Sequence, residues 1–573
     1  MIVGIDLGTT NSLIAYWKDG AARLIPNSLG SSLTPSCVSL DEDGTVLVGE
    51  AARQRLQTHP GKSASLFKRY MGSNKEFRLG KQRFRPEELS SLILRALKED
   101  AEALLGEPVT EAVISVPAYF SDGQRKATRA AAQLAGLHVE RLINEPTAAA
   151  LAYGLHQRNS ESQFLVFDLG GGTFDVSLLD MFEGVMEVRS TAGDNFLGGE
   201  DFTQEIARWF LDASGIPGKA RDDAQFMEHL TARAEAVKRR LSDAPTAELA
   251  VEWRGKPYAM ELSDSHLQQL MEPLLTRLRI PLERTLRDAG VRADDIDEVV
   301  LAGGATRAPM IRTLVTRMFG RFPSVAHNPD EVVALGAAVM AGLKARDEDL
   351  REVVMTDVCP YSLGVEIVRA LPGGELAEGH FSPIIERNTV IPASRMATYS
   401  PTHDRQPKLV IQVYQGEARL VRDNIKLGDL HIPLEGGSRE DGSVDVRFTY
   451  DVNGILEVEA TRQLTQETHR LIIRGNEESL SDDQIAARFE ALAELKIHPR
   501  DLLENRTLLA EAERVYTFLR DRDRAAMGAE ISEFEAALAT QDARVTAQAR
   551  TRLREVINYF ERAKAFLPQL DLS

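Results

Sequence analysis

Two short segments combine the residue types that bind phosphate groups and metal ions. Each begins with an aspartate, Asp6 or Asp168, at the end of an apolar run and continues with small and hydroxyl residues. Small residues let backbone amides approach a phosphate, hydroxyls can bond to it, and a carboxylate at a strand end can hold a hydrated Mg²⁺. One such turn is weak evidence, but two that face each other across a cleft can clamp one nucleotide. The small and hydroxyl residues are Gly8, Thr9, Thr10, Gly170, Gly171, Gly172 and Thr173.

A third segment, residues 300–307, suits a flat aromatic ring. Its apolar run ends in Gly303 and Gly304, so that a ring can lie against the backbone, and Arg307 can stack on that ring. Taken alone, the same residues also fit a turn followed by a solvated arginine. The segment supports a base-binding site only in combination with the two phosphate-type turns.

The elements that must position these residues alternate between strand and helix from residue 1 to about 345, which indicates an α/β fold. Each aspartate segment lies between two apolar runs. We therefore expect a duplicated domain, with halves at about 1–157 and 158–345 and a cleft between them. The expected strands include 2–5, 112–116, 164–167 and 299–301, and the expected helices include 124–135 and 262–289.

The rest of the chain contains three segments that differ in their residue patterns. Residues 346–357 are charged and then apolar, as in a linker. From 358 to about 475 the residues alternate between apolar and polar and are broken by Gly, Pro, Asn and Asp, which predicts a small all-β domain. Residues 476–573 are almost free of glycine and predict a helical segment that starts with the capping sequence 481–484. The chain is therefore expected to be multidomain.

Composition narrows the classes of function. The chain has 573 residues and a formal net charge of −18, which argues against non-specific binding to nucleic acid or to anionic membranes. Cys37 and Cys359 are far apart and show no metal or redox spacing. Neither a secretion signal nor an apolar stretch long enough to span a bilayer is evident. A cytoplasmic, mostly monomeric protein is the resulting prediction.

Four stretches together resemble a known family. Residues 4–12, 116–120, 143–150 and 168–175 look like the heat-shock chaperone ATPases of which DnaK is the bacterial type. The resemblance extends from residue 2 to about 475, and its details are closest to the HscC subgroup. It implies an actin-like ATPase domain, a β-sandwich that binds peptides and a helical lid, in an ATP-dependent chaperone that binds extended apolar segments of unfolded proteins.

The resemblance also implies roles for residues of the ATPase domain, which would use ATP or ADP, Mg²⁺ and, as a candidate further cation, K⁺. Lys68 should reach the γ-phosphate and the attacking water, Glu145 and Asp175 should orient that water, and Thr173 completes the catalytic set. Asp6 and Asp168 should hold Mg²⁺ through water. The adenosine should lie between two arginines and against one helix; without the resemblance, residues 231–242 fit an ordinary charged surface helix. The adenosine residues are Glu235, Lys238, Arg239, Ser242, Gly303, Gly304 and Arg307.

Coupling between the domains is expected to involve Pro117, Arg125 and Asp357. Part of a docking area for a J-domain co-chaperone matches Arg141, Asn144 and Thr147, although these residues also fit a solvated loop. The linker carries Thr356 where the family has an aliphatic residue, so that weaker coupling is expected. In the family that this chain resembles, a longer hairpin latches across the cleft and slows nucleotide release; the hairpin at about 249–258 is shorter, so that fast release and little need for an exchange factor are expected.

The resemblance implies a peptide pocket around Leu409 and Ile411, with Val368 and Thr402 over the peptide. Leu409 stands where the family usually has the smaller Val. The segment 369–383 between two expected strands is longer than in the family, and the helical lid is short. All four pocket residues also fit buried core positions. Sugar kinases and actin-like filament proteins share the nucleotide clamp, but neither accounts for the segments after residue 358.

Overall fold

The computed structural model describes most of the chain, in the ranges 1–139, 142–154, 161–182, 185–324, 326–347, 350, 354–370, 376–391, 393–434, 438–450, 456–473, 503–539 and 543–565. The chain forms two compact units. The first spans residues 1–72 and 76–480, and the helices α11, α12 and α13 belong to the second.

A mixed sheet near the N-terminus carries the first aspartate segment. Its central strand β1 pairs in parallel with β10 and antiparallel with β2, so that Asp6 lies at the end of β1 where the chain turns into β2. The strands, in sheet order, are β11 (Leu142–Asn144), β10 (Glu111–Val116), β1 (Ile2–Asp6), β2 (Asn11–Lys18) and β3 (Ala21–Leu24), with β4 (Thr34–Pro35) beside β2.

A second mixed sheet repeats this arrangement around the second aspartate segment. Its strand β12 pairs antiparallel with β13 and in parallel with β17, so that Asp168 ends up in the position that Asp6 has in the first sheet. The edge is extended by β18, the linker segment, which pairs in parallel with β14. The strands, in sheet order, are β17 (Glu298–Ala302), β12 (Ser162–Leu169), β13 (Phe174–Phe182), β14 (Val185–Asp194), β18 (Val354–Val358) and β21 (Val390–Ile391).

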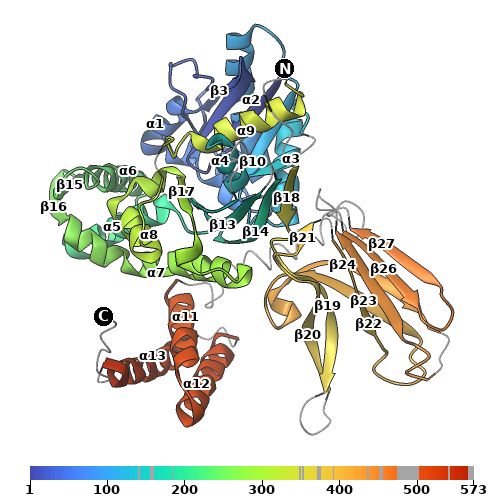
Figure 1. Cartoon of the computed structure of the whole chain (residues 1–573). Helices are drawn as coiled ribbons and strands as arrows, with labels where there is room; N and C mark the ends of the chain where they lie inside the picture. Colours follow the sequence, from blue (N-terminus) through green and yellow to red (C-terminus); the bar gives the residue numbers. More distant parts are fainter. Residues whose placement is uncertain are drawn as a thin grey trace. The chain divides into compact units, whose positions relative to one another are not determined.

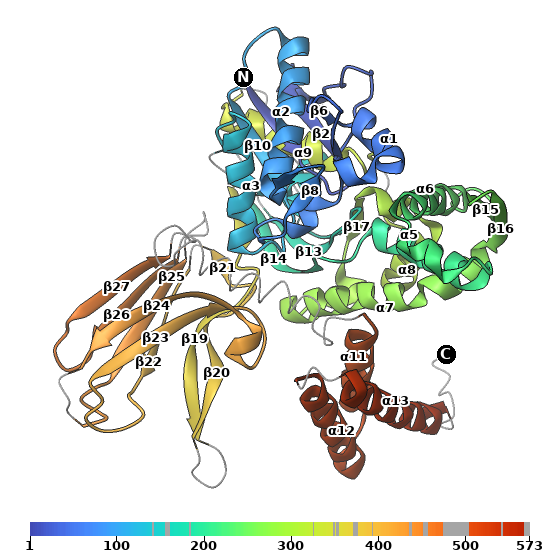
Figure 2. The same cartoon turned by 180° about the vertical axis from the view of Figure 1, so that it is seen from behind.

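Helices cover both faces of these sheets. In the first sheet, α2 and α3 lie on one face (Figure 2), and α9 lies on the other (Figure 1). Although α9 follows β17 of the second sheet in sequence, it packs against β1 and β2 of the first. A Cβ at Gly4 would lie 2.2 Å from the Ala338 backbone nitrogen, so that only glycine permits this close approach. The helices are α1 (Glu50–Thr58), α2 (Pro86–Leu105), α3 (Asp122–Leu134), α4 (Glu145–Ala152), α5 (Gly199–Ala213), α6 (Ala224–Arg240), α7 (Asp264–Ala289), α8 (Pro309–Phe319) and α9 (Val332–Lys344).

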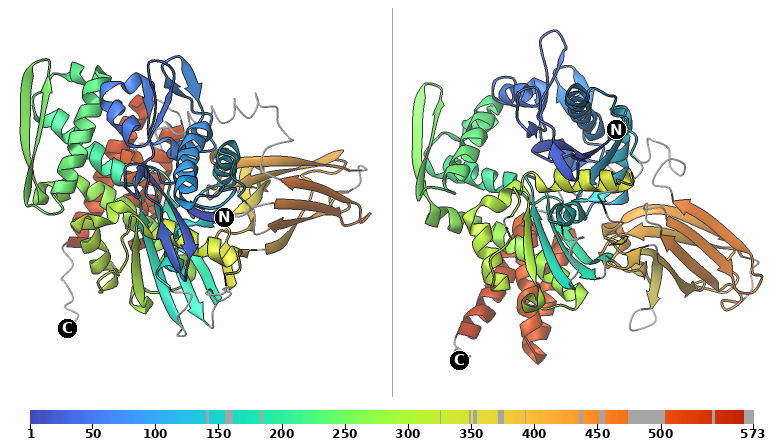
Figure 3. Two further views of the ribbon diagram at one scale, coloured as in Figure 1. Left: turned by 90° about the horizontal axis from the view of Figure 1, so that it is seen from above. Right: turned by 45° about the horizontal axis from the view of Figure 1, so that its top comes forward.

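Three smaller sheets complete this α/β region, as we call residues 1–345. One of them is the hairpin β15–β16, whose residues are alternately exposed and buried against α6; it lies at the outer edge of the region (green in Figure 3). Their strands are β5 (Val38–Leu40), β6 (Val46–Val48) and β7 (Ser63–Ala64), β8 (Phe77–Leu79) and β9 (Gln82–Phe84), and β15 (Thr246–Trp253) and β16 (Lys256–Ser263).

The segment after the linker is all β, as predicted. Two four-stranded antiparallel sheets share one apolar core, to which Val413 contributes from the first sheet and Phe448 from the second. We call these two sheets the β-sandwich. The first contains β20 (Leu376–Ile385), β19 (Leu363–Ala370), β23 (Lys408–Gln415) and β24 (Ile425–Pro433), and the second contains β22 (Ala393–Tyr399), β25 (Val444–Tyr450), β26 (Leu456–Arg462) and β27 (Thr468–Ile473).

The second unit is helical, also as predicted. Its helices are α11 (Leu503–Phe518), α12 (Asp521–Ala539) and α13 (Ala543–Ala565), and they share a core around Leu508, Phe534 and Leu553. The capping sequence expected at 481–484 lies outside the described residues. None of the helices that the structure describes combines the length and apolar character needed to cross a bilayer.

Candidate functional site

The two aspartate segments form turns that touch each other. The first turn joins β1 to β2 and the second joins β12 to β13, where the Gly170 amide donates to the Thr173 carbonyl at 3.0 Å. A Cβ added at Gly171 would lie 2.4 Å from Thr10 Cγ2, and one at Gly172 would lie 2.5 Å from Thr9 Cγ2. The two glycines are therefore required for the contact, and the prediction that the turns face each other is confirmed.

Beneath the turns lies a buried cluster of charged side chains. Lys68 lies in the short helix η2 (Phe67–Tyr70), and its Nζ donates to Glu145 Oε1 at 2.7 Å. Lys68 is 4 % and Glu145 7 % exposed. Asp168 and Asp175 are buried beside them, and Asp175 Oδ1 accepts a hydrogen bond from the Tyr119 amide at 3.1 Å. The structure thus brings together residues that lie up to 107 positions apart in the chain.

Burial and crowding shift the pKa values of this cluster. Burial, followed by the charge of Glu145, raises the pKa of Asp6 to about 7 and that of Asp175 to about 8. The same two causes raise the pKa of Asp168. Burial alone would lower the pKa of Lys68, but the charges of Glu145 and Asp6 outweigh it and raise that pKa. Lys68 therefore remains charged at neutral pH, and additional positive charge would stabilise the ionised carboxylates.

Asp6 and Asp168 fit a hydrated divalent cation. The Oδ2 atom of Asp168 is buried and accepts no hydrogen bond from the residues that the structure describes. Asp6 Oδ1 accepts a hydrogen bond from Ser115 Oγ at 3.0 Å, which orients its carboxylate. The described ranges contain no group of three or more His, Cys, Asp or Glu side chains arranged to hold a metal ion directly. Binding of Mg²⁺ through water molecules stays a prediction.

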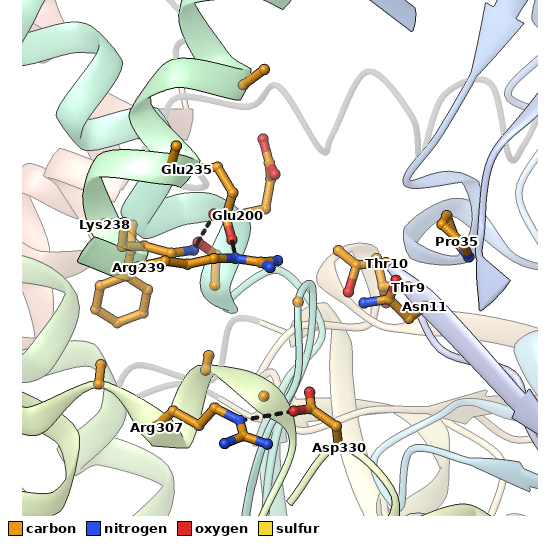
Figure 4. A pocket seen from close by; sticks show the side chains of 18 of the residues that line it. Thr9, Thr10, Asn11, Pro35, Glu200, Glu235, Lys238, Arg239, Arg307 and Asp330 are labelled. Carbon is orange, nitrogen blue, oxygen red and sulfur yellow. Dashed lines mark hydrogen bonds and ion pairs between the residues drawn. The ribbon is translucent and has the colours of Figure 1, made fainter. Parts of the chain in front are cut away.

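Above the turns opens a cavity of about 1460 Å³. Figure 4 shows Glu235, Lys238 and Arg239 on one wall, Arg307 with Asp330 on another, and Thr9 and Thr10 opposite. Arg307 is held by Asp330 Oδ2 at 2.8 Å. The residues predicted for adenosine thus line one cavity that reaches the phosphate-type turns. Those that line it are Glu235, Lys238, Arg239, Ser242, Gly304 and Arg307. Gly303, with φ +79°, precedes Gly304 and does not line the cavity.

The wall formed by α6 is tied to α5. Lys238 Nζ donates to the Gly199 carbonyl at 2.7 Å and to Thr203 Oγ1 at 2.9 Å, and Glu235 accepts from Thr203 Oγ1 at 2.6 Å. Burial favours a higher pKa for Glu235, but the charge of Lys238 and these hydrogen bonds lower it. Glu235 and Lys238 are therefore fixed as an ion pair. Gly199 and Thr203 were not among the predicted site residues.

A second residue that the sequence reasoning did not assign is Arg69. Its guanidinium lies beside Gly172, and Nη2 donates to Asp201 Oδ2 at 2.5 Å. Arg69 lies in the first half of the α/β region and Asp201 lies in α5 of the second half, so that this ion pair joins the two halves. Its position directly after Lys68 was the only available signal.

The predicted coupling residues form a connected chain. Arg125 Nη2 donates to Asn144 Oδ1 at 2.7 Å, and Asn144 Nδ2 donates to Asp357 Oδ2 in β18 at 2.5 Å. Pro117 is buried at the start of the segment whose carbonyls Arg125 also binds. The linker is therefore bonded directly to the neighbourhood of Glu145.

The prediction that Asn144 and Thr147 lie on the surface is wrong in this arrangement. They are 7 % and 9 % exposed. Asn144 is buried because it bonds to Arg125 and Asp357, and Thr147 because α4 packs against both α9 and β12. Arg141 and the linker residue Val353 lie outside the described residues.

A second contact joins the α/β region to the β-sandwich. Arg387 makes two hydrogen bonds to the Asp288 carboxylate in α7, at 2.7 and 3.0 Å, and a third to Glu417 at 2.5 Å. The next residue, Asn388, accepts a hydrogen bond from the Thr191 amide at 2.9 Å. This turn was not predicted, because no local pattern marks it.

The predicted peptide-pocket residues lie in or near β19 and β23. Ile411 is 4 % exposed and belongs to the core of the β-sandwich, whereas Leu409 is only partly buried against that core. Val368 lies where the pairing of β19 with β20 shifts register. The Thr402 amide donates to Gln406 Oε1 at 3.2 Å. Ile411 is thus a buried core residue, which is the alternative that its sequence position also allowed. The peptide-binding role of all four residues stays a prediction.

Comparison with known proteins places these features in context. A family model described as Hsp70 protein matches residues 2–77 and 75–566. The "Chaperone protein DnaK" of Thermotoga petrophila and that of Thermotoga maritima are each 41% identical to this chain over 504 residues, covering 85% of the chain and 83% of the relative. The protein of the same name from Thermosipho africanus is 39% identical over 496 residues, covering 84% and 81%.

Proposed function

This chain belongs to the Hsp70 family of ATP-dependent chaperones, and we propose that its ATPase cycle uses the buried cluster beneath the two turns. The family resemblance predicted from the sequence is confirmed, and with it the ATPase and chaperone activities. The HscC subgroup stays a prediction. The domain layout that we propose is an actin-like ATPase domain at 1–345, a linker at 346–357, a peptide-binding β-sandwich at 358–475 and a helical lid at 476–573.

The reaction proposed for this cluster is phosphoryl transfer from ATP to water, in which positioning and charge neutralisation provide most of the catalysis. Lys68 stabilises charge that develops on the γ-phosphate, and Glu145 and Asp175 orient the attacking water. Thr9, Thr10 and the turn 170–173 bind the phosphates through amides and hydroxyls. Mg²⁺, held through water by Asp6 and Asp168, supplies further neutralisation of phosphate charge when it is bound.

One observation carries this assignment: the mutual contact of the two turns directly above Lys68 and Glu145. The glycines that allow it, Gly171 and Gly172, would collide with Thr10 and Thr9 if they carried side chains. A nucleotide in the cavity would then place its base between Arg239 and Arg307 and its phosphates at the turns. A sugar kinase or a filament protein would share this clamp, but neither reading accounts for the β-sandwich.

The partners that we propose follow from the family. Unfolded proteins with extended apolar segments would bind the β-sandwich around Leu409, and a J-domain protein would act near Asn144 and Thr147. Because Asn144 is bonded to Asp357 of β18, contact with its side chain requires β18 to move, whereas Thr147 is covered by the packing of α4. A measurement of the affinity for a short fluorescent apolar peptide, with ATP and with ADP, tests the chaperone assignment. Equal affinity in both states would contradict it.

Nucleotide release is proposed to be fast, so that an exchange factor is not required. Within the described residues, no ion pair joins the hairpin β15–β16 to the first half of the α/β region. Exposed ion pairs contribute about 0–1 kcal/mol each. A hairpin that lacks a few of the ion pairs that would hold the cleft closed is therefore expected to release the nucleotide about 10- to 100-fold faster. Stopped-flow release of fluorescent ADP, with and without an added exchange factor, checks this. Slow release that the factor strongly accelerates would contradict the proposal.

A further inference from the structure

Thr203 lies in α5 and bonds to two residues of α6 that line the cavity, although it does not line the cavity itself. Its side chain is 0 % exposed. The Oγ1 atom lies 3.1 Å from the Gly199 carbonyl oxygen, 2.6 Å from Glu235 Oε2 and 2.9 Å from Lys238 Nζ. A hydroxyl has one proton, so that it cannot donate to Gly199 and to Glu235 at the same time. The acceptor that receives this proton decides what Thr203 does.

The Thr203 proton goes to Glu235. Lys238 lowers the pKa of Glu235 against the effect of burial, so that the carboxylate is ionised, and a charged acceptor forms the stronger hydrogen bond. The Gly199 carbonyl keeps a partner, because Lys238 Nζ donates to it at 2.7 Å. Lys238 also donates to Thr203 Oγ1. The hydroxyl therefore accepts from the ammonium group and donates to the carboxylate, which fixes its direction.

The Glu235 carboxylate passes this orientation on to Arg239. Its Oε2 atom is engaged by Thr203 and by Lys238, the latter at 2.5 Å, and its Oε1 atom accepts from Arg239 Nε at 2.7 Å. The Arg239 side chain is 69 % exposed, so that packing does little to hold it. The hydrogen bond to Glu235 therefore sets where the guanidinium lies at the cavity (Figure 4).

We propose that Thr203 is a positioning residue for adenosine: its hydroxyl fixes the Glu235 carboxylate, which in turn holds Arg239 in place for the base. The inference rests on the adenosine site proposed above. Because Thr203 acts on the wall of the cavity and not on the cluster around Lys68, it contributes to the affinity for the nucleotide rather than to the hydrolysis of bound ATP.

Thr128 offers a matched control. It lies in α3 and is 1 % exposed, and its hydroxyl donates to the Gln124 carbonyl, four residues earlier, at 3.0 Å. Thr203 has the same relation to the Gly199 carbonyl. Replacement of either threonine by valine removes a buried hydroxyl from a helix and keeps a similar shape. Only at position 203 does that change remove a hydrogen bond to a charged residue of the cavity wall.

The test compares equilibrium binding of Mg-ADP to the full chain, measured by titration calorimetry, with single-turnover hydrolysis at saturating Mg-ATP. Thr203→Val is expected to weaken Mg-ADP binding about three- to tenfold, the size of one lost hydrogen bond, whereas the rate of hydrolysis should change less than about twofold. Thr128→Val should change neither quantity more than about twofold. Unchanged affinity in Thr203→Val, or equal loss in both variants, would overturn the proposal. A rate that falls as far as the affinity would show general damage and overturn it too.

Further variants locate the effect. Thr203→Ser keeps the hydroxyl and should retain the wild-type affinity within about twofold; a loss as large as that of Thr203→Val would assign the effect to the methyl group, and the proposal fails. Thr203→Ala removes the hydroxyl without adding a group and should repeat the loss even if the valine variant does not fold. In the Glu235→Ala background, Thr203→Val is expected to add no loss, because residues that act through one another are not additive. A further loss there overturns the inference alone, whereas wild-type affinity in Arg239→Ala overturns the proposed adenosine site.

Discussion

The proposed nucleotide cavity and the expected peptide pocket are lined by different kinds of residue. The cavity rests on buried polar groups with specific partners, such as Lys68 with Glu145 and Glu235 with Lys238. The two central pocket positions are aliphatic side chains on β23, of which Ile411 is a core residue and Leu409 is partly buried. In the cavity each of these residues has a proposed chemical role. In the pocket, the residues predicted to bind peptide are also explained by ordinary packing of the core.

This difference predicts how each region responds to substitution. A buried charged pair tolerates no loss of one partner, because the remaining charge is left uncompensated. An aliphatic pocket tolerates changes of shape far better than the introduction of charge. Substitutions that remove charge should therefore damage the first region most, and substitutions that add charge should damage the second.

The largest expected effect comes from Lys68→Ala. The substitution removes the positive charge beside Glu145 and the proposed γ-phosphate position. It is expected to lower the rate of single-turnover ATP hydrolysis about 10²-fold or more, the size seen for loss of one electrostatic stabiliser, while ATP still binds.

Lys62→Ala is the matched control. Lys62 forms an ion pair of the same 2.7 Å length with Glu42, but at the surface, where such pairs contribute little. Its hydrolysis rate should stay within about twofold of the wild-type value. Comparable loss in both variants, or an unchanged rate in Lys68→Ala, would remove Lys68 from the proposed mechanism.

The second effect in size concerns the β-sandwich. Leu409→Asp places a charge at a partly buried apolar position and is expected to weaken binding of an extended apolar peptide at least about tenfold, because full burial of a leucine side chain is worth about 1.5–3 kcal/mol. Basal ATP hydrolysis should be retained. Fluorescence anisotropy with a labelled peptide measures the change.

Leu471→Asp separates a pocket from general damage to the core. Leu471 lies in β27 and is also partly buried against the same core, so that both variants carry a comparable cost for folding. If the two variants weaken peptide binding equally, Leu409 has no special place in the pocket.

The same contrast explains how much the sequence could predict. The turns at Asp6 and Asp168 could be assigned because the same combination of aspartate, glycine and threonine occurs twice, each time after an apolar run, and the alternation of strands and helices predicted both sheets. The packing of α9 on the first sheet could not be predicted, because Gly4 and Ala338 acquire meaning only once they touch. Arg387 was missed for a related reason, since a lone arginine in a loop carries no local signal of its distant partner.

The smallest of these effects is expected at Arg387, where the two regions meet. Its guanidinium binds Asp288 through two parallel hydrogen bonds and Glu417 through a third, a geometry that only arginine provides. Arg387→Ala removes the cation that bridges the Asp288 and Glu417 carboxylates and should weaken the contact between the regions. The ratio of peptide affinities with ADP and with ATP is then expected to fall about three- to tenfold, because ATP can no longer lower the peptide affinity of the β-sandwich through this contact. Arg387→Lys keeps the charge but loses the paired hydrogen bonds, so that its affinity ratio should lie between those of the wild type and Arg387→Ala. Arg422→Ala removes an exposed arginine whose nearest carboxylate, Asp423, is 3.9 Å away, and should leave the ratio unchanged. A normal ratio in Arg387→Ala would mean that the linker strand β18, rather than this turn, carries the coupling between the two regions.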